Sequence, residues 1–283
     1  ANESCDFTIR AFDADGGYAD LNVSCSVAEN NQSETPTDEF PSFLSSLDLG
    51  SNVIVSEVFP CDGLKYVISG KFTDSLQVGS LKADAKSDYD GFALKVNSAG
   101  VGETLLHMVC DGEISLAGTI TDKDENIHFV GSFSGKLTVG FLEIESSGKN
   151  DLFVISWSKD GDLLNLQGIG GAGDEIATSA SSSNDSIFLG GYFSDSFDYG
   201  NSQEVSGGGT DGFVMSLSLL NFNQVNWFMP LTGTGDEFVR ALDADSTGSL
   251  FFAGSFEGTS SLGGVAVVSL GLSDAIVGKL KSD

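Results

Sequence analysis

The sequence predicts an all-β protein that folds as a single β-propeller, with five blades of mainly four antiparallel strands. A unit of about 60 residues recurs along the chain, and two separate strand-like motifs keep the same period. No helical periodicity of useful length is present. The 36 Gly residues fall mostly at turns, and the 21 Phe residues supply the bulk needed between neighbouring sheets.

The first motif is an apolar strand that ends in Gly-x-Phe. It occupies residues 66–72, 127–133, 187–193 and 250–256. The second motif is a strand that Asp leads in all four copies. The third residue of the motif is Phe in three copies and Ile in the fourth. The motif occupies residues 90–96, 151–157, 211–217 and 274–280. The closing Phe residues and the leading Asp residues are both spaced by 61, 60 and 63 positions, which indicates one structural repeat.

Two further strands complete each unit. A Gly-Asp-Glu motif opens a strand at residues 173–175 and 235–237, ahead of the first motif. Hairpin turns such as residues 97–100 and 159–162 follow the second motif and lead into a fourth strand. Four antiparallel strands in a unit of this length are typical of a propeller blade, whereas tandem immunoglobulin-type domains need about 100 residues each. An open stack of sheets is the alternative architecture.

The chain divides into five units within one domain, residues 1–283. The units span residues 5–50, 51–109, 110–168, 169–230 and 231–283. The first unit is diverged: its residues 10–15 repeat the sequence pattern of residues 240–245, but only 52 positions separate Asp38 from Asp90, so one strand is missing. The last unit ends after its third strand, which predicts a blade without its outer strand and with an unpaired edge.

The repeats resemble the SBBP family of bacterial-type β-propeller repeats. The resemblance rests on Gly-Thr-Gly-Asp-Glu at 233–237, Phe-Ala-Gly-Ser-Phe at 252–256 and Asp-Gly-Phe-Val-Met-Ser-Leu at 211–217. It covers residues 50–281 well and residues 5–47 poorly. It implies a propeller fold and a secreted or surface-attached protein, and it implies no particular activity.

The four cysteines predict disulfides and an oxidising compartment. They are Cys5, Cys25, Cys61 and Cys110, with no Cys-x-x-Cys pair among them. A Cys5–Cys25 bridge fits the two ends of a predicted hairpin and leaves a Cys61–Cys110 bridge. Three pairings are formally possible, and free thiols are the alternative.

An extracellular glycoprotein is the predicted class. Asn-x-Ser sequons occur at Asn2, Asn22, Asn31 and Asn184, and the chain starts at Ala1, as a mature protein does after loss of a signal peptide. The net charge of −28 excludes binding to nucleic acids and to anionic lipid surfaces. No apolar run approaches the length of a membrane span.

Acidic turns are candidate calcium sites, because Asp-x-Asp spacing places two carboxylates on one side of a turn. The candidate ligands are Asp13, Asp15, Asp122, Asp124, Asp243 and Asp245. The alternative is that these residues only form hairpin turns. No cofactor is expected to be required.

No catalytic residue is predicted, and we expect that the protein is not an enzyme. The sequence has no Gly-x-Ser-x-Gly, phosphate-binding loop or His-Glu-x-x-His motif. His107 and His128 lie in strand-like runs without a nucleophile pattern. Glu175 and Glu237 could serve a glycoside-active enzyme, but their recurrence in successive units favours a role at the start of a strand.

The predicted function is that of a secreted, glycosylated structural or interaction protein of a cell surface or extracellular fibre. We expect it to assemble head-to-tail through the unpaired blade edge, with a second copy or another surface protein as partner. A lectin-like propeller that binds carbohydrate is the first alternative, and a glycoside-active enzyme is the second.

Overall fold

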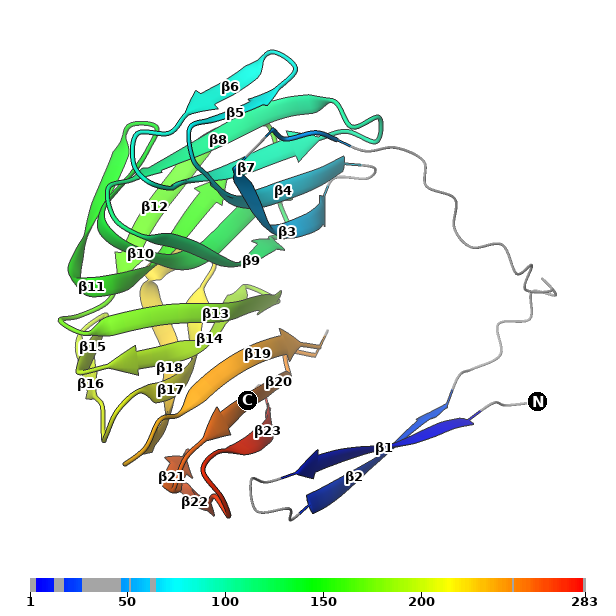
Figure 1. The fold of residues 1–283 in the computed structure, drawn as a ribbon, viewed down its shortest axis with the longest axis vertical. Coiled ribbons are helices and arrows are strands. Elements are labelled where there is room, and N and C mark those ends of the chain that lie inside the picture. Colours follow the sequence, from blue (N-terminus) through cyan, green and yellow to red (C-terminus); the bar gives the residue numbers. More distant parts are fainter. Residues whose placement is uncertain are drawn as a thin grey trace.

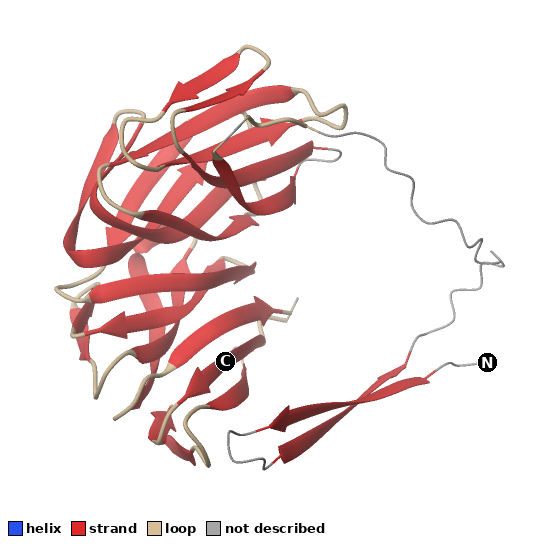
Figure 2. Cartoon of the chain, viewed as in Figure 1, coloured by secondary structure: helices blue, strands red, loops and turns tan. Residues whose placement is uncertain are grey.

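The computed structural model describes residues 47–50, 52–61, 65–245 and 247–281, together with the backbone of strands β1 (Ser4–Phe12) and β2 (Tyr18–Ser26). Every regular element in these residues is a β-strand, and all strand pairs are antiparallel (Figure 2). The predicted all-β class is therefore confirmed.

Four groups of antiparallel strands follow one another along the chain, and we number them sheets I to IV, although the pairing of β10 with β8 joins I and II into one ladder. Sheet I contains β3 (Val53–Cys61), β4 (Lys65–Phe72), β7 (Asp90–Val96) and β8 (Gly102–Cys110). Sheet II contains β9 (Ile114–Thr121), β10 (Ile127–Val139), β11 (Leu142–Trp157) and β12 (Leu163–Ile169). Sheet III contains β13 (Asp174–Ser183), β14 (Ser186–Ser194), β17 (Asp211–Ser218) and β18 (Asn221–Gly233). Sheet IV contains β19 (Phe238–Ala244), β20 (Leu250–Phe256) and β23 (Asp274–Leu280).

A hairpin that the sequence motifs did not reveal lies between the second and third strands of every sheet. The separate hairpins are β5 (Ser75–Val78) with β6 (Leu81–Asp84), β15 (Ser196–Tyr199) with β16 (Ser202–Val205), and β21 (Thr259–Leu262) with β22 (Val265–Val268). In sheet II the long strands β10 and β11 form it themselves. Two of these hairpins pair with the outer strand of the preceding sheet, since Leu137 of β10 lies opposite Cys110 of β8 and Leu262 of β21 lies opposite Leu231 of β18.

The sheets stand side by side in an open arc (Figure 1). Their first strands contact one another in the order β3, β9, β13, β19, so one edge of each sheet lies along the inner side of the arc. No ladder among the described strands joins sheet IV to sheet I. β1 and β2 pair only with each other, with Cys5 opposite Cys25 in the register. Asp38, which stands in the first unit at the place of Asp90 in the second, lies outside the described residues.

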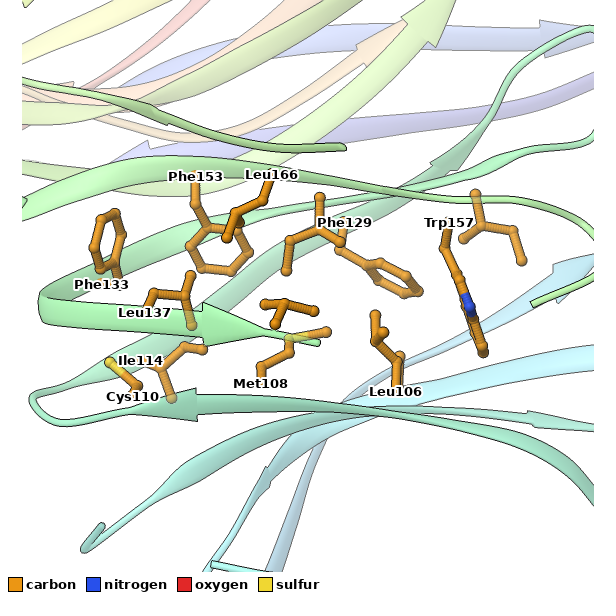
Figure 3. Packing of buried hydrophobic residues seen from close by; sticks show 14 of the residues in the cluster. Leu106, Met108, Cys110, Ile114, Phe129, Phe133, Leu137, Phe153, Trp157 and Leu166 are labelled. Carbon is orange, nitrogen blue, oxygen red and sulfur yellow. The ribbon is translucent and has the colours of Figure 1, made fainter. Parts of the chain in front are cut away.

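The hydrophobic core is divided into layers between neighbouring sheets. Between sheets I and II, Leu106 and Met108 pack against Phe129, Phe153 and Trp157 (Figure 3). Similar clusters lie between sheets II and III and between sheets III and IV. The Phe residues that close the first motif belong to this core, at exposed fractions of 0%, 0%, 0% and 5% for Phe72, Phe133, Phe193 and Phe256.

The repeated Gly of the first motif allows a neighbouring strand to approach closely. A Cβ on Gly131 would overlap the carbonyl oxygen of Ser115, and a Cβ on Gly191 would overlap that of Ile176. In both cases the contact lies between the first and second strands of one sheet. A bulge in the first strand accompanies it in all four sheets.

The Asp that leads the third strand closes the loop before it. Its carboxylate accepts the backbone N–H of the residue four positions earlier, in the pairs Asp90–Lys86, Asp151–Ser147, Asp211–Gly207 and Asp274–Leu270. The regular spacing of these Asp residues thus reflects a repeated loop closure.

Candidate functional site

The outward face of sheet IV is an uncovered copy of the interface between repeats. Val277 of β23 is 71% exposed, whereas Ala93, Val154 and Val214 at the same repeat position are each 0% exposed. Those three residues lie on sheets that have a following sheet packed against them. Sheet IV has no following sheet among the described residues.

The same contrast appears on β20. Phe251 is 44% exposed, whereas Val67 and Phe188 at the equivalent position are 0% and 6% exposed. Lys279 of β23 extends over the Phe251 ring, with its Nζ 4.6 Å from the ring centroid. The opposite face of β23 packs normally, because Ile276 and Leu280 contact the core layer shared with sheet III.

Further apolar side chains are exposed on β22 and in the loop that leads to β23. They are Val265, Val268, Leu270 and Leu272, with exposed fractions of 66%, 61%, 77% and 78%.

The outer edge of β23 is also free. β23 pairs with β20 on one side, with Val277 opposite Ala253, and no described strand pairs with its other side. The third strands of sheets I, II and III each have a fourth strand at this position. A free edge presents backbone donors and acceptors that can pair with an added strand.

The other end of the arc is partly covered by the chain that precedes it. Leu47 and Leu49 pack against a hydrophobic cluster on the outer face of sheet I, beneath the β5–β6 hairpin. On β3, Ile54, Val55 and Val58 remain 48%, 45% and 58% exposed. Apolar side chains are therefore exposed at both ends of the series of sheets.

Glu175 and Glu237 do not share a site. Each is 0% exposed, and they lie in different interfaces, Glu175 between sheets II and III and Glu237 between sheets III and IV. Their motif does open a strand, since β13 begins at Asp174 and β19 begins directly after Glu237. Neither carboxyl group is accessible to a substrate in this structure.

A hydrogen-bonded chain of Ser156, His128 and Asp122 was not recognised in the sequence, because its members are brought together only by strand pairing. Ser156 Oγ lies 2.9 Å from His128 Nδ1, and His128 Nε2 lies 3.2 Å from Asp122 Oδ2. Burial lowers the pKa of His128, so the neutral ring donates from Nε2 to Asp122 and accepts at Nδ1. Ser156 and His128 are each 3% exposed, and this chain therefore lacks the access that a nucleophile requires.

A polar pocket of about 780 Å³ opens where sheets I, II and III meet. Tyr89, which is 38% exposed, contributes an aromatic ring, and Lys71 Nζ lies 4.8 Å from its centroid. Asp88, Glu113 and Asn150 supply further polar groups. An exposed aromatic ring among hydrogen-bonding side chains is suited to a polar ligand.

The Asp carboxylates of two acidic turns accept hydrogen bonds from backbone N–H groups of the same turn. Asp122 Oδ1 accepts the N–H groups of Asp124 and Asn126 at 2.8 and 2.9 Å. Asp245 Oδ1 accepts those of Thr247 and Ser249 at 2.8 and 3.0 Å. Side-chain hydrogen bonds from Asn126 to Asp122 and from Thr247 to Asp245, together with these backbone bonds, lower the pKa of both Asp residues.

The other predicted calcium ligands are not gathered into a cation site. Asp243 Oδ1 accepts from Ser181 Oγ, and Asp124 is exposed. Asp13 and Asp15 lie outside the described residues. In the part of the chain that the structure describes, no three His, Cys, Asp or Glu side chains are grouped to hold a metal, and calcium binding stays a prediction.

Cys61 and Cys110 lie in the same core layer between sheets I and II. Cys110 is a free thiol whose Sγ lies 3.3 Å from the Glu113 carbonyl oxygen, and burial raises its pKa. The side chains of Cys5 and Cys25 lie outside the description. The predicted Cys61–Cys110 bridge is therefore not formed in this structure, and the Cys5–Cys25 bridge stays a prediction.

Of the predicted glycosylation sites, Asn184 is exposed in the turn between β13 and β14, where a glycan has room. Its φ of 54° is one that Asn tolerates in a tight turn. Asn22 lies in β2, and Asn2 and Asn31 lie outside the described residues.

No protein-family model matches the chain, and no curated protein is similar enough to count as a relative. The resemblance to SBBP-type repeats therefore rests on the sequence motifs alone. Within the described ranges there is no helix long and apolar enough to cross a membrane.

Proposed function

We propose that this chain is an extracellular interaction protein that assembles with further copies of itself through sheet IV. Its fold would be a closed ring of five units, in which residues 4–46 form the remaining unit and cover the outward face of sheet IV. The free edge of β23 would then receive a strand from a second copy. The observation that carries the proposal is the edge of β23, which pairs with no described strand, whereas the third strand of each other sheet pairs with a fourth.

The chemistry of the uncovered face supports a repeat unit as its occupant. The face carries the small and apolar side chains that pack between sheets elsewhere in the molecule, such as Val154 and Val214. Residues 10–15 repeat the sequence pattern of residues 240–245, which mark the first strand of a unit. Leu47 and Leu49 attach the end of that segment to sheet I, the unit that would follow it in a ring.

The edge of β23 supports association between copies. The backbone groups along this edge have no partner strand among the described residues. Strand addition at such an edge gives a head-to-tail contact, which closes or propagates according to its geometry.

Light scattering combined with hydrogen exchange tests the proposal. We expect the average mass to rise with protein concentration and the backbone amides of residues 274–280 to become protected in parallel. The matched control is β16, Ser202–Val205, which pairs only with β15 and whose amides should not change. A strictly monomeric protein at high concentration, with calcium present, would refute assembly, and so would assembly without protection of β23.

The polar pocket favours a second candidate function, the binding of a carbohydrate. The Tyr89 ring could stack on a sugar while Asp88, Glu113 and Asn150 bind hydroxyl groups. A glycan array probed with the wild type and with Tyr89→Ala tests this function. Tyr66, which is 43% exposed but does not line the pocket, provides the control variant Tyr66→Ala.

A further inference from the structure

Two interfaces between sheets bury a pair of carboxyl groups at the same place in the repeat. In each pair an Asp leads the third strand of one sheet and a Glu stands at the start of the first strand of the next. The pairs are Asp151 with Glu175, between sheets II and III, and Asp211 with Glu237, between sheets III and IV.

The carboxyl groups of Asp151 and Glu175 both face the space beside Gly170. A Cβ on that glycine would lie 2.6 Å from Glu175 Oε2 and 2.7 Å from Asp151 Oδ1, so the absent side chain leaves room for both. Asp151 Oδ2 accepts the N–H of Ser147 at 2.9 Å, and Glu175 Oε2 accepts that of Gly171 at 3.1 Å. The other oxygens, Asp151 Oδ1 and Glu175 Oε1, are buried without a hydrogen-bond partner.

Asp211 and Glu237 are both 0% exposed and in direct contact. Glu237 Oε1 accepts the hydroxyl of Ser260 at 2.6 Å, and Asp211 Oδ1 accepts the N–H of Gly233 at 3.2 Å. No donor reaches Glu237 Oε2. A contact between two carboxyl groups becomes a hydrogen bond only when one of them carries a proton.

The charged groups that act on these glutamates are acidic. Asp151 on β11, Asp174 on β13 and Asp198 on β15 face Glu175. Together with burial, their repulsion raises the pKa of Glu175 to about 8.

Glu237 also faces an acidic group and no basic one among the charged groups that act on it. Asp211 on β17 faces it and also acts on Glu204 of β16. Burial and the Asp211 contact raise the pKa of Glu237 to about 7. Two ionised carboxylates buried in contact would be strongly unfavourable without a counter-charge.

We propose that each pair holds one proton near neutral pH, and that this proton lets the two buried carboxyl groups of neighbouring sheets stay together until mildly alkaline pH removes it. Between Asp211 and Glu237 the proton forms a carboxyl–carboxylate hydrogen bond. The two protons make the layered core sensitive to pH between sheets II and III and between sheets III and IV. The inference does not depend on ring closure or on self-assembly.

The first interface supplies a natural comparison. There Asp90 Oδ2 lies 2.7 Å from His107 Nε2, and Asp90 Oδ1 accepts the N–H of Cys110 at 3.4 Å. Glu113, which stands in the degenerate Gly-Asp-Glu motif of this unit, is exposed. Glu113→Gln is therefore a matched control that removes a carboxyl group without touching a buried pair.

Equilibrium unfolding at several pH values tests the proposal with Glu175→Gln, Glu237→Gln, the double variant and the control. Between about pH 5.5 and 6.5 the folded wild type holds two protons that an unfolded Glu, with a pKa near 4.3, has released. Its folding constant should therefore fall by about tenfold per pH unit for each proton. The contribution of Glu237 to this fall in the folding constant ends near pH 7, and that of Glu175 ends near pH 8.

Each Gln variant should remove one tenfold fall in the folding constant per pH unit. The reason is that the amide is never ionised and donates a hydrogen bond as the protonated carboxyl does. We expect both variants to be more stable than the wild type at pH 8.5 and to show shallower pH dependence below it. His128, whose pKa is lowered, titrates in the opposite sense but does so equally in every variant. The slope difference between variants is therefore the quantity to compare.

Three results would overturn the proposal. The first is an unchanged slope in both Gln variants, and the second is an equal change in Glu113→Gln. The third is stabilisation of the wild type by Ca²⁺ at pH 8.5 that the double variant lacks, since a cation would then hold the pairs. If a variant fails to fold, infrared spectroscopy of the wild type decides: we expect a protonated-carboxyl band at pH 6.5, and its absence would refute the inference.

Discussion

The substitution Val277→Ala measures whether the outward face of sheet IV is covered in solution. At the equivalent position of sheet III, Val214 is 0% exposed against sheet IV. Val214→Ala removes two methyl-sized groups, each contributing about 0.8 kcal/mol of transfer free energy, and leaves a small cavity. We therefore expect Val214→Ala to lower the free energy of unfolding by about 2 kcal/mol.

If residues 4–46 close the ring, Val277→Ala should cost nearly as much, about 2 kcal/mol, although Val277 is 71% exposed in the described structure. Denaturant unfolding of the full chain, followed by tryptophan fluorescence, gives both values. Val205→Ala is the control, since Val205 is 62% exposed on β16, away from any repeat interface. A cost below about 0.5 kcal/mol for Val277→Ala, within the range of ordinary surface changes, would refute closure over this face.

Three further substitutions or treatments test the core and the cysteines. Phe133→Ala should destabilise the fold by about 3–5 kcal/mol, whereas Phe141→Ala, at a position 82% exposed, should be nearly neutral in the same unfolding measurement. Gly191→Ala should lower the unfolding midpoint because its Cβ would overlap the Ile176 carbonyl, and Gly264→Ala provides the control with open space around it, although its φ of 84° adds some backbone strain. Alkylation of Cys110 should be slow in the native protein and fast after unfolding, as read by mass spectrometry; no alkylation of the unfolded, unreduced chain would show the predicted bridge instead.

The strands of each sheet could be predicted because their markers serve roles inside one unit. Phe133 fills a core layer, Gly131 admits the adjacent strand, and Asp151 closes the loop before its own strand. Each role demands one residue type at one position, so the period is visible in the sequence. The exposed apolar residues of β22 and β23 have no such signature, since Val277 and Val214 look alike until their neighbours are known.

The crossing hairpins could not be predicted for a different reason. β21 and β22 have four residues each, which is too short for alternation to stand out, and the partner of β21 lies in the preceding sheet. The partners of the buried carboxyl groups are likewise set by tertiary contacts. Asp90 contacts His107, whereas Asp211 contacts Glu237. The residues next to each Asp in the sequence do not distinguish the two partners.

The hairpins that cross to the preceding sheet impose an order on synthesis and folding. β10 pairs with the outer edge of β8, so part of this edge stays unpaired until the chain has been synthesised as far as Val139. The outer edge of β18 likewise stays unpaired until residues 259–262 have been synthesised. The second and fourth units therefore shield the sheets made before them from premature pairing with other nascent chains, whereas the outer strands of sheets II and IV pair with no later hairpin among the described strands.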